Sequence, residues 1–394
     1  METNFNFRNF TPTRLFFGPG ELDSLHRHAM PGKKALLVIS NGKSTRKNGY
    51  LSRVQEELAK VGVPTILFDR IEANPLKNTV MAGAKAAREN GCDFIVALGG
   101  GSVMDASKAI GGLMAANPGD LWDYVGTGTG KGLRYPAESL PIVAITTTAG
   151  TGSEVDQWGV ITNGQTHEKI GVGSESSFPV LSIVDPTLMT TVPPEFTAYQ
   201  GFDALFHSVE AYTSKFTNLM SDMYCITAIE NVGRYLARTV RDGNDIEART
   251  RVAFGNTLSG YAMEVGVTSS QHSLEHAMSA FHPGLPHGAG LIMLSKAYFS
   301  FFIRKHTADD RFIRMAQVMG MEDAREPMDF IAALIKLQQD CGVAGLKMSD
   351  YGIRENEFET LAVNAKETMP GLFGADRYEL SLDDCVAIYR EAYQ

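Results

Sequence analysis

The sequence predicts an α/β domain built on a parallel sheet, followed by an all-helical domain. In the first half, short runs that are apolar almost throughout, such as 34–40 and 94–98, alternate with helical patterns. Strands that are buried on both faces have this composition, so the alternation indicates a parallel sheet covered by helices. After about Pro193 the strand signals stop and long amphipathic patterns follow, for example over 221–240 and 246–265.

Length and composition agree with a two-domain globular protein. The chain has 394 residues, of which 44% are hydrophobic and 21% charged, which excludes a disordered chain. Because Val192, Pro193 and Pro194 interrupt the periodicity, we place the domains at residues 1–192 and 193–394. The net charge of −9 argues against a general nucleic-acid binder, which needs a basic surface.

Cysteine usage and the N-terminus bear on the compartment. Cys92, Cys225, Cys341 and Cys385 lie far apart, so neither a disulfide framework nor a cysteine zinc site is expected. No run of 18 apolar residues is present, and residues 1–4 lack the pattern of a signal peptide. We therefore expect a cytoplasmic protein that does not associate with membranes.

The individual elements of the first half follow from local signals. We expect helices over about 50–61, from Asn74 to Gly91, and from the glycines at 99–101 to about Ala115. Asn74 is the expected N-cap of the second of these, with Pro75 in its first turn. The expected strands are 34–40, 64–68, 94–98, 141–145 and 181–185.

A glycine-rich turn, Gly99-Gly100-Gly101-Ser102, joins one of these strands to a helix. Glycine permits positive φ and a close approach of the backbone to a ligand, and a helix N-terminus favours a phosphate. Neither a GxGxxG nor a Walker pattern is present, so the residues alone leave two interpretations open. The turn either binds phosphate or is a tight strand-to-helix connection with Ser102 as N-cap.

A second polar loop, which we call the threonine loop, spans Thr146–Glu154 and directly follows another expected strand. Its hydroxyls and glycines suit a ribose, a carboxamide or phosphates, although solvated loops also have this composition. Two such loops after two strands favour a nucleotide crevice. Trp158, just beyond the loop, either forms a wall of the pocket or packs in the core, and core packing is favoured.

Four of the nine histidines fall within sixteen residues, where even spacing would place fewer than one. His272 and His276 are four residues apart and share a face if the segment is helical. His287 lies in an expected turn that can return a third imidazole to that face. His282, next to a proline, has no spacing argument and is assigned to a loop.

A second pair with the same spacing is Asp203 and His207, separated by apolar residues, which we expect to face a crevice. Each of these side chains alone is more often structural than ligating. Together they predict a site for one divalent metal. Three imidazoles and a carboxylate suit Fe²⁺, Zn²⁺, Co²⁺ or Ni²⁺ and do not suit Ca²⁺ or Mg²⁺.

With these residues and motifs the chain resembles the iron-containing (group III) alcohol dehydrogenases, and the matches run through most of its length. The segments that carry the resemblance are Phe16-Phe17-Gly18-Pro19-Gly20, Asn74-Pro75, Gly99-Gly100-Gly101-Ser102 with Asp105 and Lys108, Thr147-Thr148-Ala149-Gly150-Thr151, Asp203-Ala204-Leu205-Phe206-His207-Ser208-Val209-Glu210, and His272, His276 and Pro286-His287-Gly288.

The resemblance implies a dehydroquinate-synthase-like fold, with a Rossmann-like parallel-sheet domain before an all-α domain. It implies that Asp203, His207, His272 and His287 bind Fe²⁺ or Zn²⁺, and that His276 lies beside the nicotinamide without ligating. His276 is then the catalytic candidate, relaying a proton while the metal acts as a Lewis acid. One departure is that the gap from His276 to His287 is one residue longer than is usual in the family.

The resemblance also assigns the glycine turn to the pyrophosphate of NAD(P) and the threonine loop to the nicotinamide side. The implied cofactor contacts are Ser40, Asn41, Gly42, Gly99, Gly100, Gly101, Ser102, Asp105, Thr147, Thr148 and Thr151. The strand that ends at Ser40 carries no acid to accept the ribose 2′-hydroxyl, and Lys43, Arg46 and Lys47 follow it. We therefore expect NADP in preference to NAD, unless this cluster is only a solvated basic loop.

The expected reaction is hydride transfer between nicotinamide and a small primary alcohol or aldehyde, by an enzyme that is at least a homodimer. The alternatives of the same fold are a glycerol dehydrogenase-like polyol dehydrogenase, a hydroxyacid–oxoacid transhydrogenase and a dehydroquinate-synthase-like lyase. Few basic residues lie close to the metal motifs, which argues against the lyase. A non-enzymatic metal- or nucleotide-binding protein is disfavoured because two candidate sites occur on two domains.

Overall fold

The computed structural model describes residues 3–393, apart from the side chains of residues 113 and 114, and it divides into two compact units. Thr11–Thr191 form an α/β unit, whereas residues 3–10 join residues 192–393 in a helical unit. The division expected from the sequence assigned residues 3–10 to the first domain. They lie with the helical unit because the Asn4 amide donates to the Thr217 carbonyl and Asn4 pairs with Asn218 in a parallel bridge.

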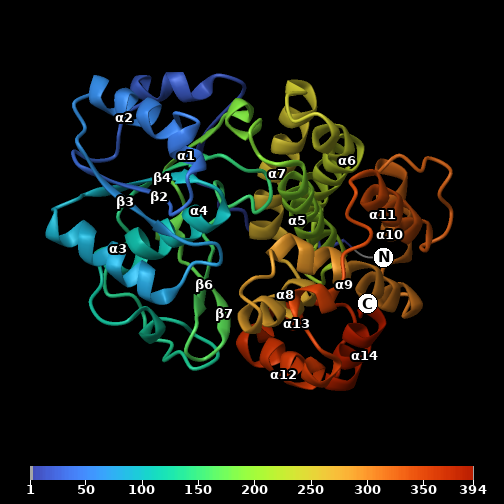
Figure 1. Ribbon diagram of the computed structural model, residues 1–394. Helices are drawn as coiled ribbons and strands as arrows, with labels where there is room; N and C mark the ends of the chain where they lie inside the picture. Colours follow the sequence, from blue (N-terminus) through green and yellow to red (C-terminus); the bar gives the residue numbers. More distant parts are fainter. Residues whose placement is uncertain (1–2, 394) are drawn as a thin grey trace. The chain divides into compact units, whose positions relative to one another are not determined.

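The α/β unit contains a six-stranded sheet in the order β1-β8-β5-β4-β2-β3, and every neighbouring pair is parallel (Figure 1). This confirms the α/β class predicted from the apolar runs. A two-stranded antiparallel hairpin, β6–β7, completes the unit. The strands are β1 Arg14–Phe17, β2 Ala35–Ser40, β3 Thr65–Ile71, β4 Phe94–Gly99, β5 Ile142–Thr146, β6 Gly159–Asn163, β7 Glu168–Val172 and β8 Leu181–Val184.

Helices cover both faces of the sheet because successive side chains of each strand point to opposite sides. In β2, Leu36 and Val38 pack in one core with α3 (Lys77–Glu89) and α4 (Gly101–Lys108). Leu37 and Ile39 pack in a second core on the other face, with α2 (Tyr50–Lys60) and the 3₁₀ helix η1 (Glu21–Arg27). The helices α2 and α3 accordingly lie on opposite sides of the sheet in Figure 1.

Some local expectations were wrong. Asn74 is not a helix cap, because it has a left-handed backbone (φ 53°) and α3 begins only at Lys77. Residues 75 and 76 instead meet the hairpin, where the Thr162 amide donates to the Pro75 carbonyl. The strands β1, β6 and β7 were not expected, since each is short and lacks a continuous apolar run. The helix α4 continues as a π-helical stretch over Ala109–Ala115.

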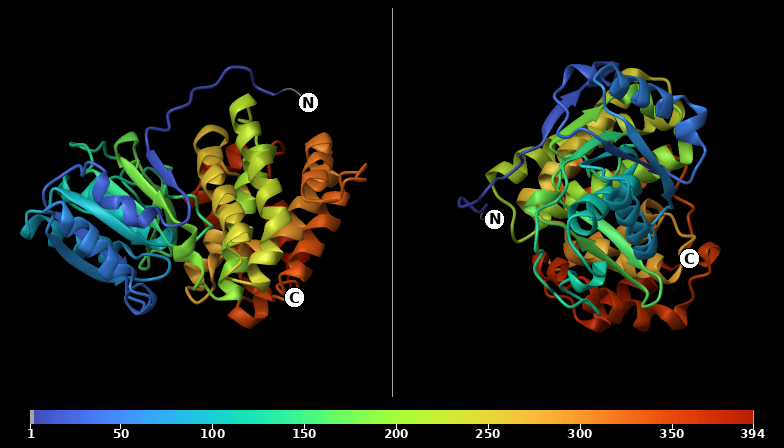
Figure 2. Two further views of the ribbon diagram at one scale, coloured as in Figure 1. Left: turned by 90° about the horizontal axis from the view of Figure 1, so that it is seen from above. Right: turned by 90° about the vertical axis from the view of Figure 1, so that its left-hand side faces the viewer.

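The helical unit is built on α5, α6 and α7, which lie side by side (Figure 2). Small residues allow close packing here, since a Cβ atom at Gly201 of α5 would lie within 3 Å of Leu236 of α6. None of the helices described is long and apolar enough to cross a membrane. The helices are α5 Pro194–Thr213, α6 Leu219–Arg241, α7 Ile246–Gly266, α8 Ser270–Phe281, α9 His287–Arg304, α10 Asp309–Val318, α11 Asp329–Asp340, α12 Phe358–Thr368, α13 Pro370–Ala375 and α14 Leu382–Ala392.

Candidate metal centre and cofactor-binding loops

The helix α5 carries the first two candidate metal ligands, Asp203 and His207, one turn apart. Nearly every residue of α5 from Ala198 to Tyr212 is buried, and the two side chains are only 6% and 8% exposed. The expected crevice is therefore an enclosed position within the helical unit. A carboxylate placed there needs compensating partners, because the loss of water around a buried charge is costly.

These partners come from two other helices. His272 lies in the first turn of α8. His287 was expected in a turn, but it is the first residue of α9. The Asp203 Oδ1 atom lies 3.5 Å from a ring nitrogen of His207, 3.5 Å from Nε2 of His272 and 3.4 Å from Nε2 of His287. Three imidazoles from three helices therefore converge on one carboxylate oxygen.

Two of the converging atoms have no hydrogen-bond partner. Among the described residues, Asp203 Oδ1 and His272 Nε2 are buried and make no hydrogen bond. Burial would raise the pKa of Asp203, but His207 and His287 hold that pKa well below its usual range. Burial would likewise lower the pKa of His272, yet Glu210 and Asp203 raise it to about 10. A buried carboxylate oxygen and a buried imidazole nitrogen that make no hydrogen bond are suitable ligands for a divalent cation.

A second layer of carboxylates lies behind two of the imidazoles. Glu210 of α5 places Oε1 2.5 Å from Nδ1 of His272, and Glu275 of α8 is hydrogen-bonded to Nδ1 of His287. Both carboxylates are fully buried. Gly290 of α9 leaves room for Glu275, since a Cβ atom there would lie 2.7 Å from Glu275 Cγ. Carboxylates in this position orient an imidazole so that its other nitrogen faces a metal.

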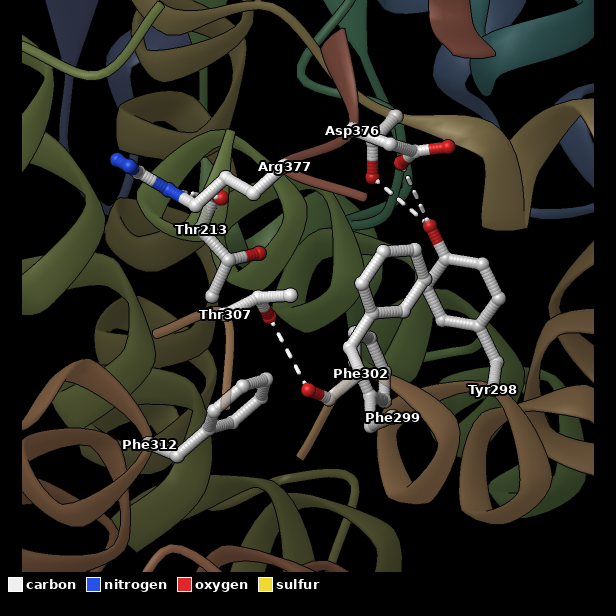
Figure 3. Close-up of a pocket in the computed structure, with 9 residues that line it drawn as sticks. Thr213, Tyr298, Phe299, Phe302, Thr307, Phe312, Asp376 and Arg377 are labelled. Carbon is white, nitrogen blue, oxygen red and sulfur yellow. Dashed lines mark hydrogen bonds between the residues drawn. The ribbon is translucent and has the colours of Figure 1, made fainter. Parts of the chain in front are cut away.

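Glu210 is held in turn by a buried polar chain. Its Oε2 atom accepts hydrogen bonds from the backbone amide of Ser269 (2.8 Å) and from the Ser269 hydroxyl (3.2 Å). The Tyr298 hydroxyl lies 3.1 Å from the Ser269 hydroxyl and donates to Asp376 Oδ1 over 3.1 Å. Figure 3 shows Tyr298 and Asp376 beside a cavity of about 10 Å³, which has room for one water molecule at most. Burial raises the pKa of Asp376 to about 7.

His276, the catalytic candidate, lies one turn beyond His272 on α8 and is also buried. Its Nδ1 atom is 3.0 Å from the sulfur of Met369, the residue between α12 and α13. The His276 and His287 ring centroids are 5.2 Å apart. His282 directly follows α8, in the loop to which it was assigned. Its Nε2 atom lies 3.2 Å from Glu357 Oε1.

The glycine turn uses its glycines for close packing. None of Gly99, Gly100 and Gly101 has a positive φ, contrary to one reason that we gave for glycine there. A Cβ atom at Gly100 would lie 2.7 Å from the Thr148 hydroxyl, and one at Gly101 would collide with Thr151. The glycine turn and the threonine loop therefore lie in direct contact. Ser102 is not the N-cap of α4, because the helix begins at Gly101 with Gly100 as its N-cap.

The threonine loop is attached at its start to the strand that ends at the glycine turn. The Thr147 amide donates to the Gly99 carbonyl (2.9 Å), and the Thr146 hydroxyl donates to the Thr148 carbonyl (3.0 Å). The Thr151 hydroxyl accepts a hydrogen bond from the Ser153 amide (3.2 Å). The carboxyl ends of β4 and β5, which are neighbours in the sheet, thus bring the glycines and the hydroxyls together.

The other candidate cofactor residues occupy different positions. Ser40 ends β2, and Asn41 and Gly42 follow it in an exposed loop near Lys43. The Asp105 carboxylate accepts hydrogen bonds from the Ser153 hydroxyl (2.8 Å) and from the Val160 backbone amide (3.0 Å). Trp158 is 46% exposed, so the expectation that it packs in the core was wrong.

Glu210 and Lys108 lie in segments that carry the family resemblance, but neither was given a role there. Glu275, Met369, Tyr298 and Asp376 were not expected at the site. Glu210 lies three residues after His207, and Glu275 lies three after His272, so helical spacing alone places each acid near a ligand. The Tyr298–Asp376 and His276–Met369 contacts join positions 78 and 93 residues apart, so they leave no local signal.

Comparison with known families gives a consistent result over both units. The family model described as "Iron-containing alcohol dehydrogenase" matches residues 12–186. The model described as "Fe-containing alcohol dehydrogenase family, C-terminal" matches residues 197–393. Together the two models cover almost the whole chain.

Individual relatives span the same length. The chain is 33% identical over 396 residues to 1,3-propanediol dehydrogenase of Klebsiella pneumoniae, which covers 98% of this chain and 99% of that protein. It is 32% identical over 397 residues to a probable NADH-dependent butanol dehydrogenase of Bacillus subtilis, with the same coverage. A solved structure of an archaeal halo-thermophilic alcohol dehydrogenase from a Red Sea brine pool superimposes with a TM-score of 0.93 at 31% identity, covering 99% of this chain and 100% of that one.

Proposed function

The chain belongs to the iron-containing alcohol dehydrogenase family, and on that premise we propose that it transfers hydride between a nicotinamide cofactor and a small primary alcohol or the matching aldehyde. The observation that carries this proposal is the convergence of His207, His272 and His287 on Asp203 Oδ1. The relatives named for propanediol and butanol support a short-chain substrate.

Asp203, His207, His272 and His287 are the proposed ligands of one divalent metal, Fe²⁺ or Zn²⁺. The buried atoms without hydrogen bonds and the three imidazoles that converge on one carboxylate support this assignment. Such a metal, when bound, supplies a Lewis acid that favours ionisation of the alcohol hydroxyl near neutral pH. The acids Glu210 and Glu275 hold the imidazoles of His272 and His287 in the orientation that this role requires.

His276 is the proposed catalytic residue that moves a proton. If the Nδ1 proton of His276 faces the Met369 sulfur, which lies 3.0 Å away, Nε2 is left as the proton acceptor. During alcohol oxidation the imidazole then takes up a proton, and during aldehyde reduction it returns one. An imidazole suits this exchange because its ordinary pKa is close to neutrality.

Gly99, Gly100, Gly101 and Ser102 are the proposed cradle for the cofactor's pyrophosphate, with the threonine loop on the nicotinamide side. The glycines give the backbone close access at the carboxyl end of β4, where ligands bind in open parallel sheets. Thr147, Thr148 and Thr151 contribute hydroxyl and amide groups. Asp105, which the resemblance counts among the cofactor contacts, reaches the threonine loop through Ser153.

We propose NADP rather than NAD as the preferred cofactor, bound in part by Ser40, Asn41 and Gly42. Lys43 and Lys47 are exposed and form no ion pair within the described part of the chain, so both suit a 2′-phosphate. Arg46 is paired with Asp69 at 2.5 Å and contributes less. The proposal differs from the Bacillus subtilis relative, whose name specifies NADH.

The proposed function is tested with freshly purified protein by metal analysis, followed by removal of the metal and its restoration. We expect about one Fe²⁺ or Zn²⁺ per chain, loss of aldehyde reduction on chelation, and recovery when either metal is returned. The reaction is followed by nicotinamide absorbance with a panel of short aldehydes, and kcat/KM is compared for NADPH and NADH. Full activity of the metal-free protein would refute the proposed function, whereas a strong preference for NADH would refute only the cofactor choice.

We also propose a cytoplasmic enzyme that assembles as a homodimer or a higher homo-oligomer. The four cysteines are buried and unbridged, which suits a reducing compartment. Light scattering coupled to size-exclusion chromatography gives the mass of the assembly, and a monomer would overturn the oligomeric part of the proposal.

A further inference from the structure

Lys108, at the end of α4, is one of the most deeply buried cations in the described chain, with 1% of its surface exposed. Its ammonium group donates to the Ser153 hydroxyl (2.7 Å), to Asp156 Oδ1 (2.6 Å) and to the Trp158 carbonyl (2.7 Å). All three ammonium hydrogens are therefore used. The three partners lie within six residues of one another, just after the threonines of the loop.

Asp105, one turn earlier on α4, contacts the same segment. One of its carboxylate oxygens accepts from the Ser153 hydroxyl (2.8 Å), and the other accepts from the Val160 amide at the start of β6 (3.0 Å). The Ser153 hydroxyl thus accepts from Lys108 and donates to Asp105. We call Asp105, Lys108, Ser153 and Asp156 the Lys108 clamp.

The backbone geometry makes room for this contact. A Cβ atom at Gly159 would lie 2.7 Å from the Asp105 carbonyl oxygen, so only glycine lets β6 approach α4 this closely. The clamp holds the loop at Ser153, and the hydrogen bond from the Thr147 amide to the Gly99 carbonyl holds it at the other end. Between these two attachments, Thr148 and Thr151 lie against Gly100 and Gly101.

We infer that the Lys108 clamp positions the threonine loop against the glycine turn and so sets the affinity for the nicotinamide cofactor. The inference rests on the proposed cofactor role of this loop. Lys108 and Asp105 contact the loop segment directly, and through these contacts they act as positioning residues. Burying the Lys108 ammonium group costs free energy, so packing alone does not account for a lysine at this position. Its three directional hydrogen bonds hold the polar loop in one conformation.

The test compares cofactor binding in the purified parent enzyme and in Ser153→Ala, which removes the shared hydroxyl but keeps the Lys108–Asp156 pair. The dissociation constants of NADPH and NADH are measured by nicotinamide fluorescence, without substrate. We expect both to rise about fivefold, the effect of one lost buried hydrogen bond. We expect metal affinity to change less than twofold, and kcat at saturating cofactor less than threefold.

Two further variants separate positioning from general stability. Trp122→Phe removes a buried hydrogen bond to Glu168 (2.8 Å) elsewhere in the α/β unit, and it should leave both dissociation constants unchanged. The double variant Lys108→Met with Asp156→Asn removes both charges of the ion pair, so neither is left unpaired. It should weaken cofactor binding more than Ser153→Ala does. If the double variant does not fold, Ser153→Ala still decides.

The possible results distinguish the two proposals. Equal cofactor affinity in the parent and Ser153→Ala, or an equal loss in Trp122→Phe, would overturn the role of the clamp and leave the proposed function intact. A parent enzyme that bound neither NADPH nor NADH would overturn the proposed function and the clamp's role with it.

Discussion

Glu210 Oε1 lies 2.5 Å from Nδ1 of His272, and the opposite nitrogen of the same ring lies 3.5 Å from Asp203 Oδ1. The imidazole is therefore held between two carboxylates, one behind it and one in front. With the Nδ1 proton donated to Glu210, Nε2 faces the candidate metal position, where a bound metal would take the place of the Nε2 proton. The Ser269–Tyr298–Asp376 chain holds Glu210 in place.

The substitution Glu210→Gln should weaken metal binding about 10- to 100-fold, because a neutral amide orients and polarises the imidazole less than a carboxylate does. Competition with a chelating dye measures the affinity. Glu230→Gln is the matched control, since Glu230 on α6 is 49% exposed and contacts Arg234. Metal affinity equal to that of the parent would show that Glu210 does not support the metal centre.

The carboxyl of Asp376 should make stability depend on pH. Burial raises its pKa from an ordinary value of 3.8 to about 7, so the folded protein binds this proton more tightly than the unfolded chain. Between these two pKa values the free energy of unfolding falls as pH rises, and above pH 7 it falls no further on account of this carboxyl. In Asp376→Asn this dependence is absent. Relative to the parent, the variant should gain about 2–3 kcal/mol in unfolding free energy between pH 5 and pH 8.

Denaturant unfolding of both proteins at pH 5 and pH 8 measures this change, and the comparison cancels the titration of groups common to both. Asparagine keeps an acceptor for the Tyr298 hydroxyl, which donates to Asp376 Oδ1. A parallel pH dependence in the two proteins would show that Asp376 titrates normally.

Gly101→Ala should weaken cofactor binding about tenfold with little loss of helical stability. Alanine favours the helix, but its methyl group would overlap the Cγ2 atom of Thr151 and displace the threonine loop. Adding Thr151→Ser removes that methyl group and retains the hydroxyl, so the double variant should recover much of the affinity. Fluorescence titration with NADPH tests both steps, and the absence of recovery would contradict the packing explanation.

Lys43→Gln should lower the ratio of kcat/KM for NADPH over NADH about three- to tenfold, since it removes the exposed charge that we propose for the 2′-phosphate. Arg46→Gln should change the ratio less, because the Arg46 guanidinium already pairs with Asp69. Steady-state kinetics with both cofactors measures the ratios. An equal effect of the two substitutions would argue against this placement of the 2′-phosphate.

Much of the fold follows from local pattern. The sheet strands other than β1 were expected, because each contains a short apolar run. The strands β2, β4, β5 and β8 are buried on both faces, whereas β3 at the edge of the sheet is only partly buried. The strand β1 was not expected, since its four residues become a strand by pairing with the distant β8. The hairpin β6–β7 was not expected either, since its two neighbouring segments carry no long apolar run. Asn74 carried the signals of a helix cap, but the contact of Pro75 with Thr162 decided the local conformation.

By itself, the sequence determined the α/β and helical classes, the pairs Asp203–His207 and His272–His276, and the two polar turns, since these depend on periodicity and short spacing. Only the tertiary structure brought three imidazoles to one oxygen of Asp203 and placed Nδ1 of His276 against the sulfur of Met369. It also changed the role of the glycines, from positive φ to contact with the threonine loop. The physical reason is that convergence and close packing are relations between side chains distant along the chain, which no local propensity encodes.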